Sequence, residues 1–153
     1  MKEHIERGYE AFKGFPLKDK IDGCPCCRLD SSEKILHTKS LRSLSFDDLE
    51  DFIFKAMTTF GDVDDFKHFL PRILELYIDD FFGAPYDIGI LFSKLEYAKW
   101  EAWPEEEYGA VDQLIKVWIK TLKKSKSEDD LEILENIRSD MDIYKTDLGN
   151  LFF

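Results

Sequence analysis

Three cysteines lie within four positions of the chain, in the loop sequence DGCPCC at residues 22–27. Cys24 and Cys27 have the two-residue separation with which paired thiolates face one tetrahedral zinc ion. Cys26 could supply a third thiolate if the backbone took an unusual course, and the fourth ligand would have to be His37, His4 or His68. No second C-x-x-C pair follows, so the sequence predicts a zinc site here with an incomplete set of ligands.

Two other roles fit the same cysteines. A C-x-x-C pair exchanges disulfides when it stands at the start of a helix in a β-α-β setting, and no such setting surrounds this loop. Cysteine is also a small apolar residue, so the three side chains could simply anchor the loop against neighbouring helices. The residues alone leave the structural, metal-binding and redox roles open.

A second set of polar side chains follows helical spacing between Gly61 and Phe82. Its members recur in steps of three and four residues and form one stripe, here called the polar stripe: Asp64, His68, Arg72, Glu75 and Asp79, with Asp65 beside the first. Such a stripe is typical of a solvated helix face. It would also suit a surface that binds a basic partner, or a carboxylate–histidine site at Asp64, Asp65 and His68.

The apolar residues of the same segment predict the helix that carries this stripe. They share the spacing of one wide helix face and are Val63, Phe66, Leu70, Ile73, Leu74, Tyr77 and Phe81. Asp62 can accept the unpaired amide hydrogens of the first turn and so marks the start. Pro71 removes a backbone donor and clashes with the preceding turn, so we expect a kink, or two helices that meet there.

Helical spacing and cap residues predict the other elements as well. The expected helices cover residues 1–15, 31–36, 46–60, 87–100, 104–126 and the stretch from residue 127 onward. Residues from about 14 to 31 have no helical period and predict an irregular loop that contains the cysteines. No stretch alternates with a period of two for long enough to predict a strand. The sequence therefore predicts an all-α fold of six or seven helices, packed as antiparallel hairpins in a HEAT-like or armadillo-like stack or as an irregular bundle.

Length and composition indicate one domain over residues 1–153, because 44% hydrophobic residues can bury a core without disulfides or metal. The net charge of −11 argues against nucleic acid and against anionic membrane surfaces, and favours a basic protein partner. Residues 45–153 hold twelve Lys and Arg against twenty-five Asp and Glu, whereas residues 1–44 hold nine against seven. Many of these acids stand at helix starts, where the helix dipole favours them, so only the excess indicates a partner.

The N-terminus lacks the apolar core of a signal peptide, and no apolar run reaches membrane-spanning length. An odd number of clustered cysteines is not a secreted disulfide framework, so we expect a cytoplasmic protein. The chain has no Gly-rich phosphate loop, no G-x-S-x-G and no H-E-x-x-H. We therefore expect a binding protein rather than an enzyme.

Three segments together resemble an uncharacterised family of small acidic bacterial proteins. They are DGCPCC at residues 22–27, FKAMTTFGDVDDFKHFLPRILEL at residues 54–76 and KLEYAKWEAWP at residues 94–104. The resemblance covers about half of the chain. It implies a bacterial, cytoplasmic origin and carries no mechanism with it.

Two hypotheses of function follow from these residues. The first is a protein–protein interaction module whose polar stripe and neighbouring acids bind a basic partner, in the manner of small proteins that mask a nuclease toxin. The alternative is a zinc-binding protein that uses Cys24, Cys26 and Cys27. We favour the first, because it needs only a surface that the sequence visibly has.

Overall fold

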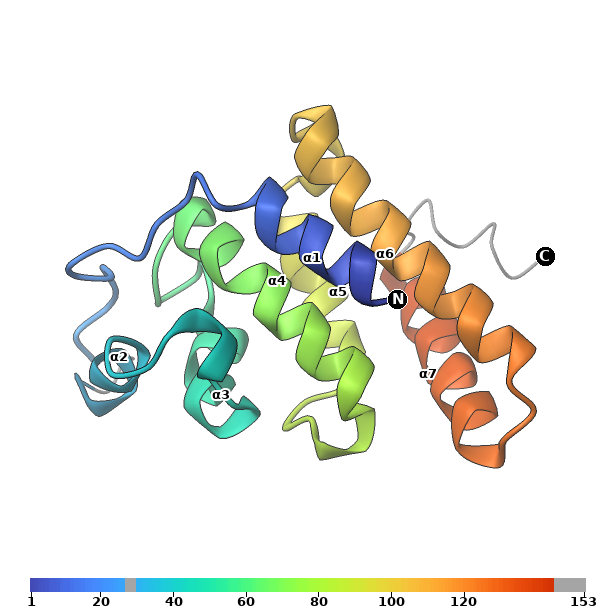
Figure 1. The fold of residues 1–153 in the computed structure, drawn as a ribbon. Helices are drawn as coiled ribbons and strands as arrows, with labels where there is room; N and C mark the ends of the chain where they lie inside the picture. Colours follow the sequence, from blue (N-terminus) through green and yellow to red (C-terminus); the bar gives the residue numbers. More distant parts are fainter. Residues whose placement is uncertain (27–29, 145–153) are drawn as a thin grey trace. The chain divides into compact units, whose positions relative to one another are not determined.

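The computed structural model describes residues 1–26 and 30–144, with side chains up to residue 141. Over these residues the protein is all-α, with seven α-helices packed against each other and no β-strand (Figure 1). This confirms the predicted fold class. The helices are α1 (Lys2–Ala11), α2 (Asp30–Leu36), α3 (Phe46–Lys55), α4 (Val63–Asp79), α5 (Ile88–Tyr97), α6 (Glu105–Lys124) and α7 (Glu128–Tyr144). The short 3-10 helices are η1 (Leu41–Ser43), η2 (Phe81–Gly83) and η3 (Trp100–Ala102).

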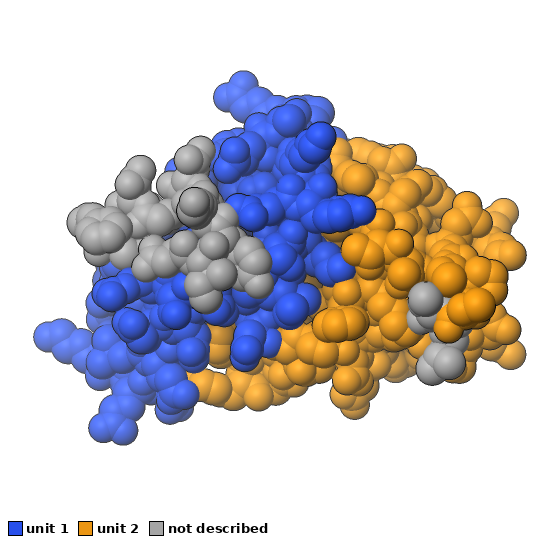
Figure 2. All heavy atoms as spheres, turned by 180° about the vertical axis from the view of Figure 1, so that it is seen from behind, with its two compact units in different colours: residues 1–11, 87–153 blue, residues 12–86 orange. Residues whose placement is uncertain are grey.

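The chain divides into two compact units, which Figure 2 colours separately. Residues 12–86 form the central unit, and residues 1–11 together with residues 87 onward form the terminal unit. Each unit contains buried apolar side chains from several helices. The single domain expected over residues 1–153 stays a prediction.

The core of the central unit is aromatic. The ring of Phe52 on α3 lies 5.3 Å from that of Phe60 and 4.6 Å from that of Phe69 on α4. Phe46 meets the edge of Tyr77 at 5.2 Å. All five side chains are buried, and aromatic pairs of this geometry stabilise a core beyond the area they bury. These contacts hold α3 against α4.

Helix α3 ends five residues earlier than the spacing of its apolar residues predicts. Its start is confirmed, because the Ser45 hydroxyl accepts from the Asp48 amide while the Asp48 carboxylate accepts from the Ser45 amide. After Lys55 the chain turns back on itself, with Met57 in the left-handed region at φ 64°. The Lys55 carbonyl accepts from the amides of the residues that follow, including Phe60 at 3.1 Å. This turn replaces the helical hydrogen bonds that a longer helix would have made.

Helix α4 runs through Pro71 as a single element, so the prediction that two helices meet there is wrong. A proline inside a helix costs about 3 kcal/mol. Here Leu70 and Pro71 are both buried, and the helix also buries Phe66, Ile73 and Tyr77. Burial of large apolar side chains at about 1.5–3 kcal/mol each outweighs the proline.

In the terminal unit, α6 and α7 form an antiparallel hairpin, α1 lies along α6, and α5 packs against α7 (Figure 1). The helix predicted from residue 104 is confirmed as α6, and the buried residues of its apolar face are Val111, Leu114, Ile115, Trp118, Ile119 and Leu122. On α7, Ile137 and Met141 are buried, but Leu131 is 51% exposed. Leu131 precedes Ile137 by six residues, and this separation rotates its side chain by about 120° around the helix axis. Leu131 therefore lies outside the buried face.

The start of α5 receives its cap from another helix. Its own N-cap residue, Asp87, makes no side-chain cap, and the Asp140 carboxylate of α7 accepts from the Gly89 amide at 3.0 Å. Burial raises the pKa of Asp140, the Gly89 amide opposes this, and the charge of Asp87 adds to it. One hydrogen bond thus links the two helices and satisfies an amide that α5 leaves unpaired.

Replacing Asp140 by alanine should therefore lower the free energy of unfolding by about 1 kcal/mol, the usual cost of a lost cap. Asp140→Asn keeps an oxygen acceptor and drops a charge that burial disfavours, so it should be at least as stable as the native protein. Urea unfolding followed by circular dichroism measures both. Equal destabilisation by alanine and asparagine would contradict this role.

Candidate functional site

The cysteine loop is irregular in its described part and is tied to the turn that follows α3. The Cys24 amide donates to the Thr59 carbonyl at 2.9 Å, and the Gly61 amide donates to the Asp22 carbonyl at 2.6 Å. Gly61 has φ 72°, and a Cβ there would lie 2.9 Å from the Cβ of Asp65, so only glycine fits. Cys24 is half-buried and Cys26 is exposed.

No group of three or more metal-ligating side chains lies together within residues 1–26 and 30–141. Cys27, one of the predicted zinc ligands, falls outside the described residues. His37 is held by another partner, since its Nε2 lies 3.3 Å from Oε1 of Glu33. The same Glu33 oxygen accepts from the Ile21 amide at 2.8 Å. The zinc site on Cys24, Cys26, Cys27 and His37 stays a prediction.

The first part of the polar stripe faces the N-terminal loop of the central unit. Asp62 and Asp65 exchange side-chain to amide hydrogen bonds of 2.9 and 3.0 Å at the start of α4. The Lys18 ammonium group lies 2.8 Å from Oδ2 of Asp62 and 3.5 Å from Oδ1 of Asp65. Asp65 is only 4% exposed, and this burial raises its pKa. Burial also acts to raise the pKa of Asp62, but the hydrogen bonds from Lys18 and the Asp65 amide outweigh it and lower that pKa.

His68 and its neighbour Lys67 hold the same loop one turn further along α4. Nδ1 of His68 donates to the Phe15 carbonyl at 2.7 Å, because a carbonyl oxygen can only accept. The Lys67 ammonium group lies over the Phe15 ring, 4.7 Å from its centre. Burial lowers the pKa of His68, and the Phe15 carbonyl opposes this effect. These contacts fix the loop to α4 rather than present a free surface.

The rest of the polar stripe contains residues that make internal contacts and residues that are exposed. Nε of Arg72 donates to the Leu44 carbonyl at 2.8 Å, and another of its nitrogens binds the Glu75 carboxylate at 2.8 Å. Asp64 and Asp79 are exposed. Of the six residues predicted as a binding surface, these two alone are freely presented to solvent, and four serve contacts within the central unit.

A different acidic surface lies between α2 and the start of α3. A cavity of about 390 Å³ opens there, here called the acidic groove. Its lining residues are Ser31, Ser32 and Ile35 of α2, Asp47, Asp48, Glu50 and Asp51 of α3, and Tyr86. The run Asp47-Asp48-Leu49-Glu50-Asp51 is visible in the sequence, but acids at a helix start have the structural explanation given above. Only the tertiary structure places them on a cavity.

The four carboxylates of the groove are unequally neutralised. Oδ2 of Asp48 binds Lys39 at 2.7 Å and Oδ1 of Asp51 binds Lys55 at 2.6 Å. Oδ2 of Asp51 is buried and has no hydrogen-bond partner in the part of the chain that the structure describes. Asp47 and Glu50 are exposed and form no ion pair with any described residue. The groove therefore keeps negative charge and one buried acceptor without a donor.

An aromatic pair borders the acids. The ring of Phe54, which is 52% exposed, lies 5.2 Å from the ring of Tyr86 at an angle of 32°. Burial raises the pKa of Tyr86, and the charges of Glu50 and Asp51 raise it further. The phenol is thus close enough to two carboxylates to share their field, and it stays protonated as a hydrogen-bond donor.

No family model, curated protein or solved structure matches this chain. The resemblance to small acidic bacterial proteins accordingly stays a prediction. Among the described residues, no helix combines the length and the hydropathy that crossing a membrane requires.

Asp64 and Asp65 are neighbours at the start of α4, but we expect their replacement by alanine to change the free energy of unfolding by very different amounts. Asp65→Ala removes the acceptor of the Asp62 amide and a partner of Lys18, so the free energy of unfolding should fall by about 1–2 kcal/mol. Asp64→Ala is the matched control, because Asp64 is exposed and makes no described side-chain contact. Urea unfolding compares the two. Similar midpoints for both variants would remove Asp65 from this role.

His68 predicts a dependence of stability on pH. Because burial lowers its pKa, the folded protein binds fewer protons than the unfolded chain between the two pKa values, so the stability rises with pH across that interval and is lost as the pH falls. The His68→Gln variant should lose less stability than the native protein between about pH 7 and about pH 5. His4→Gln, on α1, is the control and should follow the native protein.

Proposed function

We propose that this protein is an interaction module that binds a basic segment of a partner protein in the acidic groove. The observation that carries the proposal is at Asp51, a residue that lines the groove, because its buried Oδ2 lacks a donor among the described residues. A buried carboxylate oxygen without a hydrogen bond is costly, by about 1–3 kcal/mol or more. A cationic donor from a partner would remove that cost.

The negative charge around Oδ2 of Asp51 favours a positively charged segment of the partner. Asp47 and Glu50 add two exposed carboxylates to the same groove, whereas Lys39 and Lys55 each neutralise one neighbour. Two unit charges 4 Å apart near a protein surface interact by about 4 kcal/mol before desolvation is counted. The groove therefore favours a segment with more than one positive charge, and the net charge of −11 repels acidic competitors.

The aromatic border favours arginine over lysine within that segment. A guanidinium group can stack on Tyr86 and Phe54 while its N–H groups donate to a carboxylate. An ammonium group is more strongly hydrated and presents a single point charge. Arginine thus matches both the rings and the acids of the groove.

A fast and salt-sensitive association follows from the same charges. An acidic surface raises the rate at which a basic partner arrives, and salt screens this attraction over about 8–10 Å. A protein that masks a basic nuclease toxin needs both properties. The acidic groove meets this need better than the polar stripe, in which Asp65, His68, Arg72 and Glu75 already serve internal contacts.

The test is binding of a blocked, fluorescein-labelled Gly-Arg-Gly-Arg-Gly peptide, followed by fluorescence anisotropy at low salt. A variant with Asp47→Asn and Glu50→Gln should bind at least about ten-fold more weakly, which corresponds to about 1.4 kcal/mol. The control variant, with Asp64→Asn and Asp79→Asn, removes the same charge from the exposed ends of the polar stripe. It should bind within about two-fold of the native protein, since distant exposed charges are screened.

Equal weakening by both double variants would mean that net charge, and not the groove, attracts the peptide. Stronger weakening by the control would return the binding surface to the polar stripe. No binding of the peptide by the native protein at low salt would overturn the proposal itself.

A variant at Tyr86 tests whether the aromatic pair makes the groove prefer arginine over lysine. Tyr86→Leu keeps an apolar side chain but removes the ring face, so the preference for Gly-Arg-Gly-Arg-Gly over Gly-Lys-Gly-Lys-Gly should shrink by about three-fold or more. Tyr97→Leu, at an exposed tyrosine of the terminal unit, is the control. The ratio of the two dissociation constants is the quantity to compare, because it cancels general effects of charge.

A further inference from the structure

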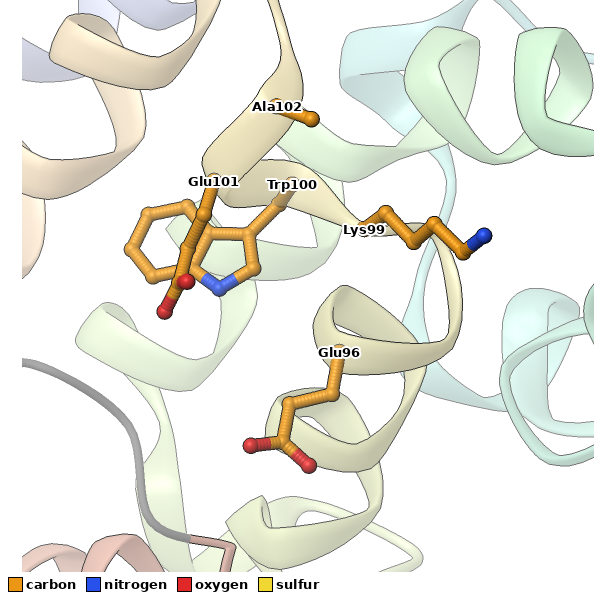
Figure 3. Close-up of a pocket in the computed structure, with 5 residues that line it drawn as sticks. All are labelled: Glu96, Lys99, Trp100, Glu101 and Ala102. Atoms are coloured by element: carbon orange, nitrogen blue, oxygen red, sulfur yellow. The ribbon is translucent and has the colours of Figure 1, made fainter.

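A second cavity lies at the end of α5, entirely on residues of the terminal unit. Its volume is about 400 Å³, and Figure 3 shows its lining residues, Glu96, Lys99, Trp100, Glu101 and Ala102. We call it the Trp100 pocket. Nothing in the proposed function uses these residues, which lie on α5, on η3 and, for Lys99, between the two.

The indole of Trp100 carries a polar atom that the fold leaves unsatisfied. The residue is 1% exposed, and its ring packs 4.9 Å from that of Tyr108. Its Nε1–H has no acceptor among the residues that the structure describes, although it is buried. The nearby Trp103 differs, because its Nε1–H donates to the Ala98 carbonyl at 3.0 Å. A buried N–H group without an acceptor is rare in native proteins and calls for an explanation.

The direction of the Trp100 N–H group explains why it has no acceptor among the described residues. Trp100 lines the pocket, and in Figure 3 its ring nitrogen points to the side on which the carboxylates of Glu96 and Glu101 lie. The backbone contributes to this placement, since Lys99 has φ 53° and ψ 47°, the left-handed conformation that ordinary residues rarely adopt. That conformation separates the end of α5 from η3, on which Trp100 stands. In Figure 3 the Lys99 side chain extends away from the two carboxylates.

The charges of the pocket favour a cation beside this donor. Glu96 and Glu101 are exposed, and neither forms an ion pair within the described chain. The negative end of the α5 dipole adds to their field. A ligand that satisfies the pocket must therefore offer a positive group to the carboxylates and an oxygen acceptor to the indole N–H.

We propose that the Trp100 pocket binds a primary ammonium group carried next to a carbonyl or hydroxyl oxygen. The ammonium group would donate to Glu96 and Glu101, and the oxygen would accept from Nε1–H of Trp100. The free amino terminus of a peptide has this chemistry, with its first carbonyl beside the α-ammonium group. A small amino alcohol has it too.

The experiment follows the indole N–H signals of the three tryptophans by ¹H–¹⁵N NMR on the full chain. The Trp100 signal is assigned from its contacts with Tyr108 and from its loss in Trp100→Phe. The probes are alanyl-alanine amide, its N-acetylated form, and ethanolamine. We expect alanyl-alanine amide to shift the Trp100 signal in a saturable way at millimolar concentration, as suits so small a ligand, and to leave the Trp103 signal in place.

Matched variants separate the pocket from the overall charge. Glu96→Gln with Glu101→Gln should weaken the binding of alanyl-alanine amide by at least about ten-fold, because both acceptors of the ammonium group lose their negative charge. Glu105→Gln with Glu132→Gln changes two exposed acids of the same unit and should leave binding unchanged. Both pairs keep the three tryptophans, so the same indole N–H signals can be followed in each variant.

Each result with the three probes either supports or overturns the proposal. Binding of the free peptide but not of ethanolamine supports the site and assigns it to peptide amino termini. Equal binding of both supports the site and assigns it to small amines. Equal binding of the acetylated peptide, or a Trp100 signal that no probe moves, would overturn the proposal. Because the acidic groove is tested with a blocked peptide, failure here and failure there are distinguishable.

Discussion

The reciprocal hydrogen bonds between Asp62 and Asp65 are the constraint on which the central unit depends. They begin α4, and the same carboxylates bind Lys18, a residue forty-four positions away from Asp62. The glycine just before them turns its amide to the Asp22 carbonyl, so the loop and the helix share one junction. Two residues of the polar stripe, Asp65 and His68, hold the loop at this junction, so their side chains do not form an open binding surface.

Two polar atoms are left without partners by the described fold, and each lies beside a cavity. Oδ2 of Asp51 belongs to the acidic groove of the central unit, and Nε1 of Trp100 belongs to a pocket of the terminal unit. Proteins normally pair such atoms, because a buried donor or acceptor without a partner costs as much as a broken hydrogen bond. Both cavities also carry carboxylates, so cations are the common feature of the ligands that we infer.

The acidic residues of the chain thus have three roles. Some acids cap helices, as Asp48, Asp62 and Asp140 do. Others pair with lysine or arginine inside one unit and add to its stability. The remainder, with the exposed Glu50 among them, is the excess that composition alone indicated as a sign of a basic partner. A helix dipole explains the first role, and the basic partner that we propose would account for the last.

The sequence by itself determined the fold class, the start of α3 and the cap of α4. Each of these depends on residues within a few turns of one another, and helical periodicity records such local relations. Tertiary structure decided the end of α3, the passage of α4 through Pro71 and the roles of Lys18 and His68. It also brought α2, α3 and Tyr86 around one groove. Those outcomes depend on contacts between residues far apart in the chain, and spacing within a single element does not encode them.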